Sequence, residues 1–274
     1  MESLMNTDIQ SAVSILMLTL LMQSPAVVVQ AAAGSGPGST NNSATGQQQS
    51  HRRAPKKFRL ENSEGAVMRL WKPDLSTTAL TAEQGSITLP RTGVDNYHAL
   101  VVEKDWGYLK ESLIRYQYMH GKPSGHSTSE LTAVEKTTFE IVPDPVPREH
   151  QHYRSNDSWN FLLRFRGAPA AQVPVALETS NGSRLNGVSD SNGLVTLRIP
   201  DDFSRLDAEE RDPRTAEFSV SAEMADAGII YQTRLSAEYR VDPGRWQSLG
   251  LGVFITGTGL VAGGVLGHRA GRSA

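Results

Sequence analysis

Histidines are the residues of this 274-residue chain best suited to chemistry, and two of its seven histidines stand one residue apart. His150 and His152 lie in the segment EHQHY, beside the carboxylate of Glu149. On extended backbone, alternate side chains point to the same side, so the two imidazoles could hold one metal ion together. Imidazole with carboxylate suits nickel, cobalt, copper or zinc. The spacing therefore predicts a transition-metal site.

His120 and His126 form a second candidate pair, because they flank the loop GKPSG, which could turn both imidazoles inward. The alternative is that EHQHY is only the polar start of a strand and that the histidines are surface or hydrogen-bonded core residues. The two interpretations differ in one respect. A metal site requires His120, His126, His150 and His152 to converge, whereas the alternative leaves them on separate surfaces.

The rest of the chain argues against catalysis and against nucleic-acid binding. There is no cysteine, no Gly-x-Ser-x-Gly, no phosphate-binding glycine loop and no dinucleotide fingerprint. The net charge is −2, and the basic run at 51–57 is short and adjoins a linker. The carboxylate pairs Asp201–Asp202 and Glu209–Glu210 lie in a polar connection. We expect no enzyme activity; a hydrolase would need a cleft with a charged constellation.

The amino-terminal end is typical of an export signal. Residues 9–29 carry no charge, and the small residues at 31–33 suit a signal peptidase. We expect residues 1–33 to be a signal peptide cleaved near Ala33. The start MESLMNTD has no basic residue, so retention of the segment as an anchor stays open.

The carboxyl-terminal end predicts a transmembrane helix over residues 246–267, which are uncharged and about as many as a bilayer core requires. The basic residues in the tail 268–274 predict a cytoplasmic C-terminus. The alternative is a buried glycine-rich hairpin. Gly259, Gly263 and Gly267 would form one stripe on a helix, which favours association with another helix.

The residues between the two ends read as a linker followed by strands. Residues 34–57 are rich in Gly, Ser, Asn and Gln, as in a disordered linker. From 58 to 241, apolar residues recur with period two, as at Trp159, Phe161 and Leu163, and turn signals such as DSNG separate the runs. The segment 111–120 could be helix or strand, and its alternation favours a strand. A proline-rich stretch divides a first β domain, 58–147, from a β-sandwich domain, 148–241.

Four motifs of this region carry a resemblance to a known family. They are the strand 140–143, the Gly-x-Pro at 167–169, the Val-x-Leu at 175–177 and the hairpin 190–200. Together they resemble a family of exported bacterial proteins of unknown function, catalogued with periplasmic components of nickel and cobalt uptake. The resemblance implies transthyretin-like or carboxypeptidase-regulatory-like sandwiches. Members linked to metal uptake often carry a histidine near the mature N-terminus, whereas here the first histidine, His51, lies in the linker.

The sequence as a whole predicts an all-β protein with two Ig-like or transthyretin-like sandwich domains. We expect it to be held on the periplasmic side of the inner membrane by its C-terminal helix. The leading expectation for its function is the binding of nickel or cobalt through His150, His152, His120, His126 and Glu149, for delivery to a metal transporter. The alternative is a non-enzymatic structural or adaptor module that binds another envelope protein.

Overall fold

The computed structural model describes residues 29–31, 55–148, 151–204 and 212–245. The expected transmembrane segment, most of the expected signal peptide and linker, and the ligand candidates Glu149 and His150 lie outside these residues. Among the described residues, no helix has both the length and the apolar character needed to cross a membrane.

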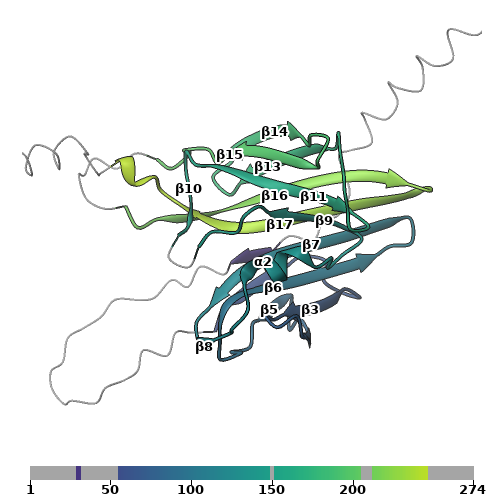
Figure 1. Cartoon of the computed structure of the whole chain (residues 1–274), viewed down its shortest axis with the longest axis horizontal. Coiled ribbons are helices and arrows are strands. Elements are labelled where there is room, and N and C mark those ends of the chain that lie inside the picture. The colour runs from purple at the N-terminus through teal and green to yellow at the C-terminus, as the bar shows by residue number, and fades with distance from the viewer. Residues whose placement is uncertain (1–28, 32–54, 149–150, 205–211, 246–274) are drawn as a thin grey trace, which may run out of the picture.

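The described part of the chain is built almost wholly of β-strands, as expected (Figure 1). The first region runs from β2 to β8, the second from β9 to β17, and β1 precedes both. The strands are β1 (Val29–Ala31), β2 (Lys57–Leu60), β3 (Val67–Trp71), β4 (Thr77–Leu80), β5 (Ser86–Thr88), β6 (Val94–Asp105), β7 (Leu109–Met119), β8 (Lys122–Pro123), β9 (Phe139–Pro143), β10 (Tyr153–Arg154), β11 (Ser158–Phe165), β12 (Ala168–Pro169), β13 (Pro174–Thr179), β14 (Arg184–Val188), β15 (Leu194–Arg198), β16 (Thr215–Asp226) and β17 (Ile229–Arg240). The helices are α2 (Thr128–Ala133) and the 3-10 turn η1 (Pro243–Arg245).

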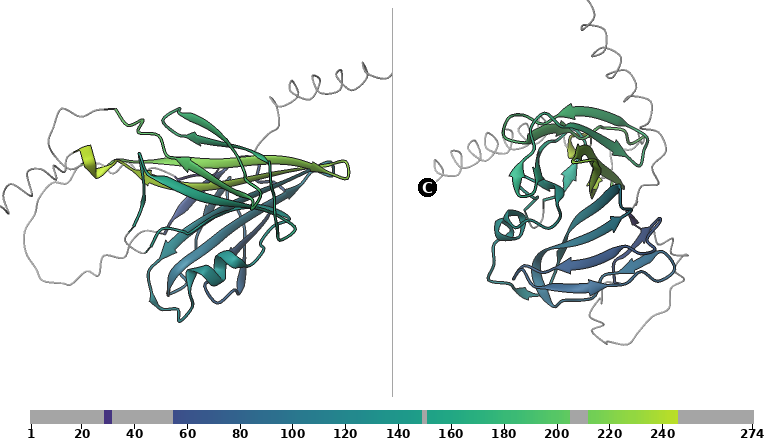
Figure 2. Two further views of the ribbon diagram at one scale, coloured as in Figure 1. Left: turned by 45° about the horizontal axis from the view of Figure 1, so that its top comes forward. Right: turned by 90° about the vertical axis from the view of Figure 1, so that its right-hand side faces the viewer.

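One large sheet joins the two regions in the order β14-β13-β16-β17-β7-β6-β3-β4. The join is a parallel pairing of β17 with β7, from Ile230 opposite Leu109 to Leu235 opposite Ile114. A second sheet, formed by β9, β11, β12 and β15, packs against the second region's part of the large sheet. Figure 2 shows the two regions stacked when the molecule is viewed along its length. Strand β9 precedes the expected domain boundary at 147 but pairs with β11 beyond it.

The period-two alternation is confirmed in the second region, where Trp159, Phe161 and Leu163 on β11 are buried. The segment expected to be a strand rather than a helix is confirmed as β7. Strand β6 is buried on both faces. Its Ala99 and Val101 join the large core shared with the second region, and its Leu100 and Val102 join a smaller core within the first. Apolar burial of this kind contributes roughly 25 cal/mol per Å².

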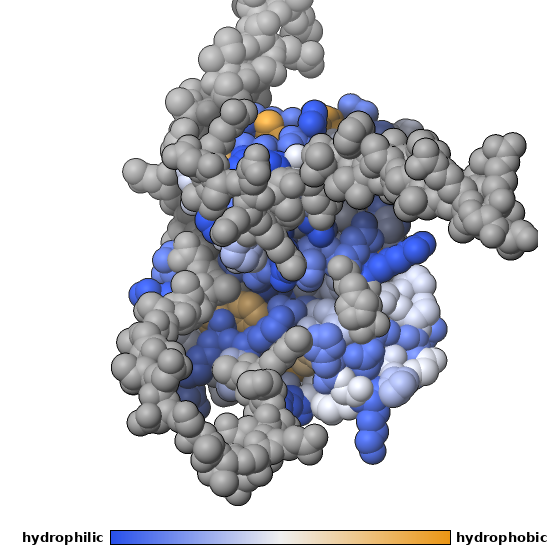
Figure 3. All heavy atoms as spheres, turned by 90° about the vertical axis from the view of Figure 1, so that its left-hand side faces the viewer, coloured by the Kyte–Doolittle hydropathy of each residue, from blue (hydrophilic) through white to orange (hydrophobic). Residues whose placement is uncertain are grey.

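Two further features complete the description of the fold. Val29–Ala31, which lie within the expected signal peptide, pair antiparallel with β2. The face of the molecule at the end that carries η1 is mainly hydrophilic, with only small hydrophobic spots among its described residues (Figure 3).

Candidate functional site

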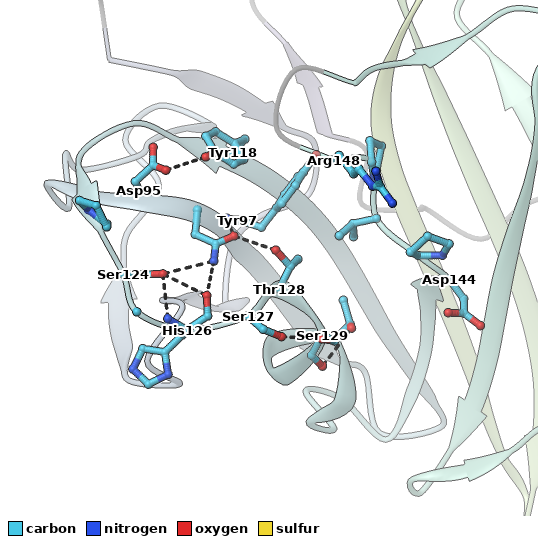
Figure 4. A pocket seen from close by; sticks show the side chains of 17 residues that line it. Asp95, Tyr97, Tyr118, Ser124, His126, Ser127, Thr128, Ser129, Asp144 and Arg148 are labelled. Carbon is cyan, nitrogen blue, oxygen red and sulfur yellow. Dashed lines mark hydrogen bonds between the residues drawn. The ribbon is translucent and has the colours of Figure 1, made fainter.

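A pocket of about 650 Å³ lies where the first region meets the segment that follows β9 (Figure 4). Its walls come from the start of β6, the end of β7, the loop before α2, α2 itself and the proline-rich stretch 144–148. The lining residues are Asp95, Asn96, Tyr97, Tyr118, Pro123, Ser124, Gly125, His126, Ser127, Thr128, Ser129, Thr132, Asp144, Pro145, Val146, Pro147 and Arg148.

Asn96 organises the polar wall of this pocket. Its side-chain Nδ2 donates to the His126 carbonyl at 2.8 Å and to Ser124 Oγ at 3.3 Å. Its Oδ1 accepts the Thr128 hydroxyl at 2.8 Å. The backbone φ of Asn96 is 132°, a region costly for a residue with a side chain, so these bonds offset local strain. The loop between β7 and α2 is therefore fixed to β6 without a ligand.

A glycine contact closes the same loop. A Cβ atom on Gly121 would lie 2.2 Å from the backbone of Gly93, so no larger residue fits there. The close approach lets Lys122 donate its backbone N–H to the Gly93 carbonyl at 2.8 Å and start β8 beside β6.

The short helix α2 was not predicted, although the sequence carries a signal for it. Ser127 and Glu130 have the spacing of a capping box, and the Ser127 backbone N–H donates to Glu130 Oε1 at 3.2 Å. His126 Nδ1 lies 3.0 Å from Glu130 Oε2. This hydrogen bond is the main reason why the pKa of Glu130 is lowered. His126 is thus tied to the helix that it precedes.

A buried charged cluster holds the other end of α2. Arg164 donates to Glu140 Oε1 at 2.7 Å and, at 2.8 Å each, to the backbone carbonyls of Thr132 and Ala133. Lys136 Nζ donates to the carbonyls of residues 131 and 134. Arg164 lies on the face of β11 opposite to Trp159, Phe161 and Leu163, where alternation alone would favour an exposed side chain. Its side chain is only 10% exposed, because these acceptors receive it.

Two charged groups that line the pocket have no ion-pair or hydrogen-bond partner for their side chains among the described residues: the Asp144 carboxylate and the Arg148 guanidinium. Between them stand Pro145, Val146 and Pro147. Figure 4 shows Arg148 next to the ring of Tyr97. Burial raises the pKa of Tyr97 to about 12, so its hydroxyl stays protonated at neutral pH. With respect to the part of the chain that the structure describes, the pocket thus offers an unpaired anion, an unpaired cation and apolar surface.

The described histidines among the predicted ligands have other partners. His120 Nδ1 lies 3.8 Å from Asp95 Oδ1, and its ring packs edge-on against Tyr118. His126 lines the pocket and contacts Glu130. His152 is partly buried and precedes Tyr153, the first residue of β10. Within the described ranges, no group of three or more His, Asp or Glu side chains could hold a metal ion. The role of Glu149 and His150 stays a prediction.

Comparison with known proteins gives only distant likeness. No family model matches the chain, and no curated protein matches it. The chain is similar to the solved structure described as "Ca2+-stabilized adhesin helps an Antarctic bacterium reach out and bind ice", with 15% identity and a TM-score of 0.26 over 68% of this chain and 43% of that one. It thus spans less than half of that protein's length. A second is the Bacteroides ovatus mixed-linkage glucan utilization locus protein SGBP-B in complex with a mixed-linkage heptasaccharide, with 10% identity and a TM-score of 0.21 over 78% of this chain and 70% of that one. At these TM-scores the likeness carries no inference.

Proposed function

We propose that the chain is a non-enzymatic adaptor of the bacterial envelope whose pocket binds an extended segment of a partner protein. The observation that carries the proposal is the preformed pocket with free Asp144 and Arg148 on either side of an apolar stretch. Because hydrogen bonds within the protein already fix its walls, binding would order few additional groups.

A peptide matches the unused groups of the pocket. The Arg148 guanidinium suits a carboxylate, which it can bind with two parallel hydrogen bonds. The Asp144 carboxylate suits a lysine, an arginine or an amino terminus. The exposed ring of Pro145, backed by the largely buried Tyr97 and Val146, gives an apolar side chain a surface to pack on. The favoured ligand therefore carries an apolar residue flanked by groups of opposite charge.

The location of the adaptor is part of the same proposal. Residues 246–267 would anchor it in the inner membrane, with the first region (β2 to β8) and the second region (β9 to β17) as Ig-like or transthyretin-like sandwiches in the periplasm. The chain is bonded to the second region at Arg245, directly before the expected anchor. The Arg245 guanidinium donates to Asp201 at 2.7 Å and to the Phe203 carbonyl at 2.9 Å.

Selection from a random peptide phage library on the full chain in detergent tests the proposal. We expect enriched peptides that share the charge pattern, and we expect Arg148→Ala to weaken their binding at least tenfold in calorimetry. Arg184→Ala is the matched control, because Arg184 is an exposed arginine on β14 that does not line the pocket. Failure to enrich any common pattern, or equal loss in both variants, would refute peptide binding at this pocket.

Metal binding is the second candidate. It is favoured because one wall of the pocket carries a predicted ligand and another adjoins two predicted ligands in the sequence. His126 lines one wall, and Arg148 on another directly precedes Glu149 and His150 in the sequence. Calorimetric titration of the full chain with Ni(II), Co(II), Cu(II) and Zn(II) tests this candidate. Stoichiometric binding that His150→Ala/His152→Ala abolishes and His51→Ala preserves would support it. Weak binding that is the same in all three proteins would exclude it.

A further inference from the structure

The turn between β6 and β7 carries the most exposed aromatic side chains of the described residues. Tyr108 is 68% exposed and Trp106 is 36% exposed. The turn lies beside that of the β16–β17 hairpin (Figure 1). There Ile230 donates its backbone N–H to the Tyr108 carbonyl at 2.9 Å, and Ile229 and Ile230 are partly exposed. We name Trp106, Tyr108, Ile229 and Ile230 the aromatic tip.

The aromatic tip is held rigid from within. The Trp106 indole N–H donates to Glu111 at 2.6 Å, and Lys104 Nζ lies 3.8 Å from the centroid of the indole ring. Asp105 accepts the Gly107 backbone N–H at 2.8 Å, with Gly107 at a φ of 87° that favours glycine. Tyr108 stands on this fixed turn, and a tyrosine side chain has few rotatable bonds, so it loses little conformational entropy when a partner covers it. Tyrosine is also among the residues that dominate the energy of protein interfaces.

The charged side chains around the aromatic tip already have bonding partners, and two of the four contacts are ion pairs. Lys110 pairs with Asp105 at 3.1 Å, and Arg166 pairs with Asp226 at 2.7 Å. Glu111 is taken by Trp106, and Lys104 donates to the Asn62 carbonyl at 2.8 Å. The tip therefore has little to attract an anionic lipid surface, and it has few free polar side chains to hold the hydroxyls of a sugar. The part of the tip that remains available for binding is the ring of Tyr108 with its hydroxyl. This ring fits an apolar recess in a protein.

The aromatic tip and the pocket lie at opposite ends of one hairpin. Strand β6 begins at the pocket, with Asp95, and ends at the tip, with Asp105. At about 3.3 Å per residue, roughly 30 Å separates the two. Strand β17 runs parallel to β7, so it leaves the tip and ends at the pole where η1 leads to the last described residue. Arg245, the last described residue, therefore lies toward the pole opposite the tip (Figure 1).

From these observations we infer that the aromatic tip is a second docking surface, which inserts Tyr108 into an apolar recess of a partner protein on the membrane-distal side. The inference rests on the proposed adaptor function, to which it adds the second contact that an adaptor requires. The pocket would engage one partner near the membrane, and the tip another about 30 Å away.

Site-specific photocrosslinking in cells tests the inference. Benzoylphenylalanine in place of Tyr108 keeps an aromatic ring at the tip, and the same residue in place of Val188, which is 55% exposed on β14, is the matched control. The protein crosslinked at 108 is identified, purified and titrated against the full chain. We expect Tyr108→Ala to weaken this binding at least tenfold, and Val188→Ala and Arg148→Ala to leave it unchanged.

The other outcomes overturn the inference in different ways. An adduct with glycan strands or with lipid would mean that the tip binds that surface instead of a protein. Absence of a specific adduct at 108, equal adducts at 108 and 188, or an affinity that Tyr108→Ala does not change would refute the docking surface. Failure of the pocket alone would appear as loss of peptide selection while the adduct at 108 persists.

Discussion

The β6–β7 hairpin has buried polar side chains near both of its faces, and the two groups differ in how well they are bonded. On the face shared with the second region, Glu140 is fully buried, and its two oxygens accept from Arg164 and from the Lys136 backbone N–H. On the opposite face His98 is also fully buried. Its Nδ1 lies 3.1 Å from the Asn96 carbonyl, but its Nε2 has no partner among the described residues.

The difference teaches which buried polar residues fix the site. The Glu140 cluster reaches the backbone carbonyls at the end of α2 and so holds one wall of the pocket in place. His98 bonds only within its own strand, and no hydrogen bond offsets the free energy of removing its Nε2 from water. We therefore expect the first group to be structurally indispensable and the second to make the fold sensitive to pH.

Removing the Arg164 side chain should have the largest effect on stability. Arg164→Met leaves Glu140 as an unpaired buried charge, which typically costs about 3–5 kcal/mol in the free energy of unfolding. Urea denaturation of the full chain in mild detergent measures the loss. The double variant Glu140→Leu/Arg164→Met, which removes both charges, should lose less than the single one. An equal loss would mean that the bonds to α2, and not the ion pair, carry the energy.

Lys136→Met should have the next largest effect, because it removes the ammonium donor to the Leu131 carbonyl and one of two side-chain donors to the Val134 carbonyl while keeping the apolar stem. Buried acceptors left without a donor cost about 1–3 kcal/mol. The same variant should weaken binding at the pocket, since α2 supplies one of its walls. An unchanged denaturation midpoint would show that water replaces the ammonium, and the contrast with His98 would then fail.

The strands of the second region could be predicted from sequence because their signal is local. Each alternates apolar and polar residues, and turns such as Asp190–Gly193 separate them. In this turn the Asp190 carboxylate accepts the backbone N–H groups of Asn192 and Leu194. The strand assignment for β7 succeeded for the same reason.

The join between the regions and the pocket could not be predicted, because their signal is not local. Nothing in the segment 109–114 indicates that it pairs with 230–235, some hundred residues later. The burial of Arg164 depends on Glu140 and on carbonyls of α2, and the alternation of apolar and polar residues does not predict these contacts. The spacing of the histidines suggested a metal site but did not show which side chains lie beside each imidazole. In the structure, His126 contacts Glu130.

His98 makes stability depend on pH. Burial lowers its pKa below the ordinary value of 6.5. Between the lowered and the ordinary pKa the unfolded chain binds a proton that the folded chain does not, so the free energy of unfolding falls as pH falls below about 6.5. For one proton the slope is at most about 1.4 kcal/mol per pH unit. Denaturation between pH 7 and 5 should show a smaller slope in His98→Gln, whereas His120→Gln, at an exposed site, should match the wild type.

Tyr116→Phe should have the smallest effect, and it tests whether bonding rather than location separates the two groups. Tyr116 lies on the same face as the Glu140 cluster, with Lys136 Nζ 5.6 Å from the centroid of its ring, yet its buried hydroxyl has no partner among the described residues. Removal of an unpaired buried hydroxyl should leave the free energy of unfolding unchanged or raise it by up to about 1 kcal/mol. Tyr118→Phe is the matched control, because the Tyr118 hydroxyl donates to Asp95 at 2.7 Å, and its removal should cost about 1 kcal/mol. If urea denaturation shows that Tyr116→Phe destabilises as much as Tyr118→Phe, water must satisfy the Tyr116 hydroxyl. The same explanation, a hydrogen bond to water, would then apply to His98 Nε2, and the contrast between the two groups would be lost.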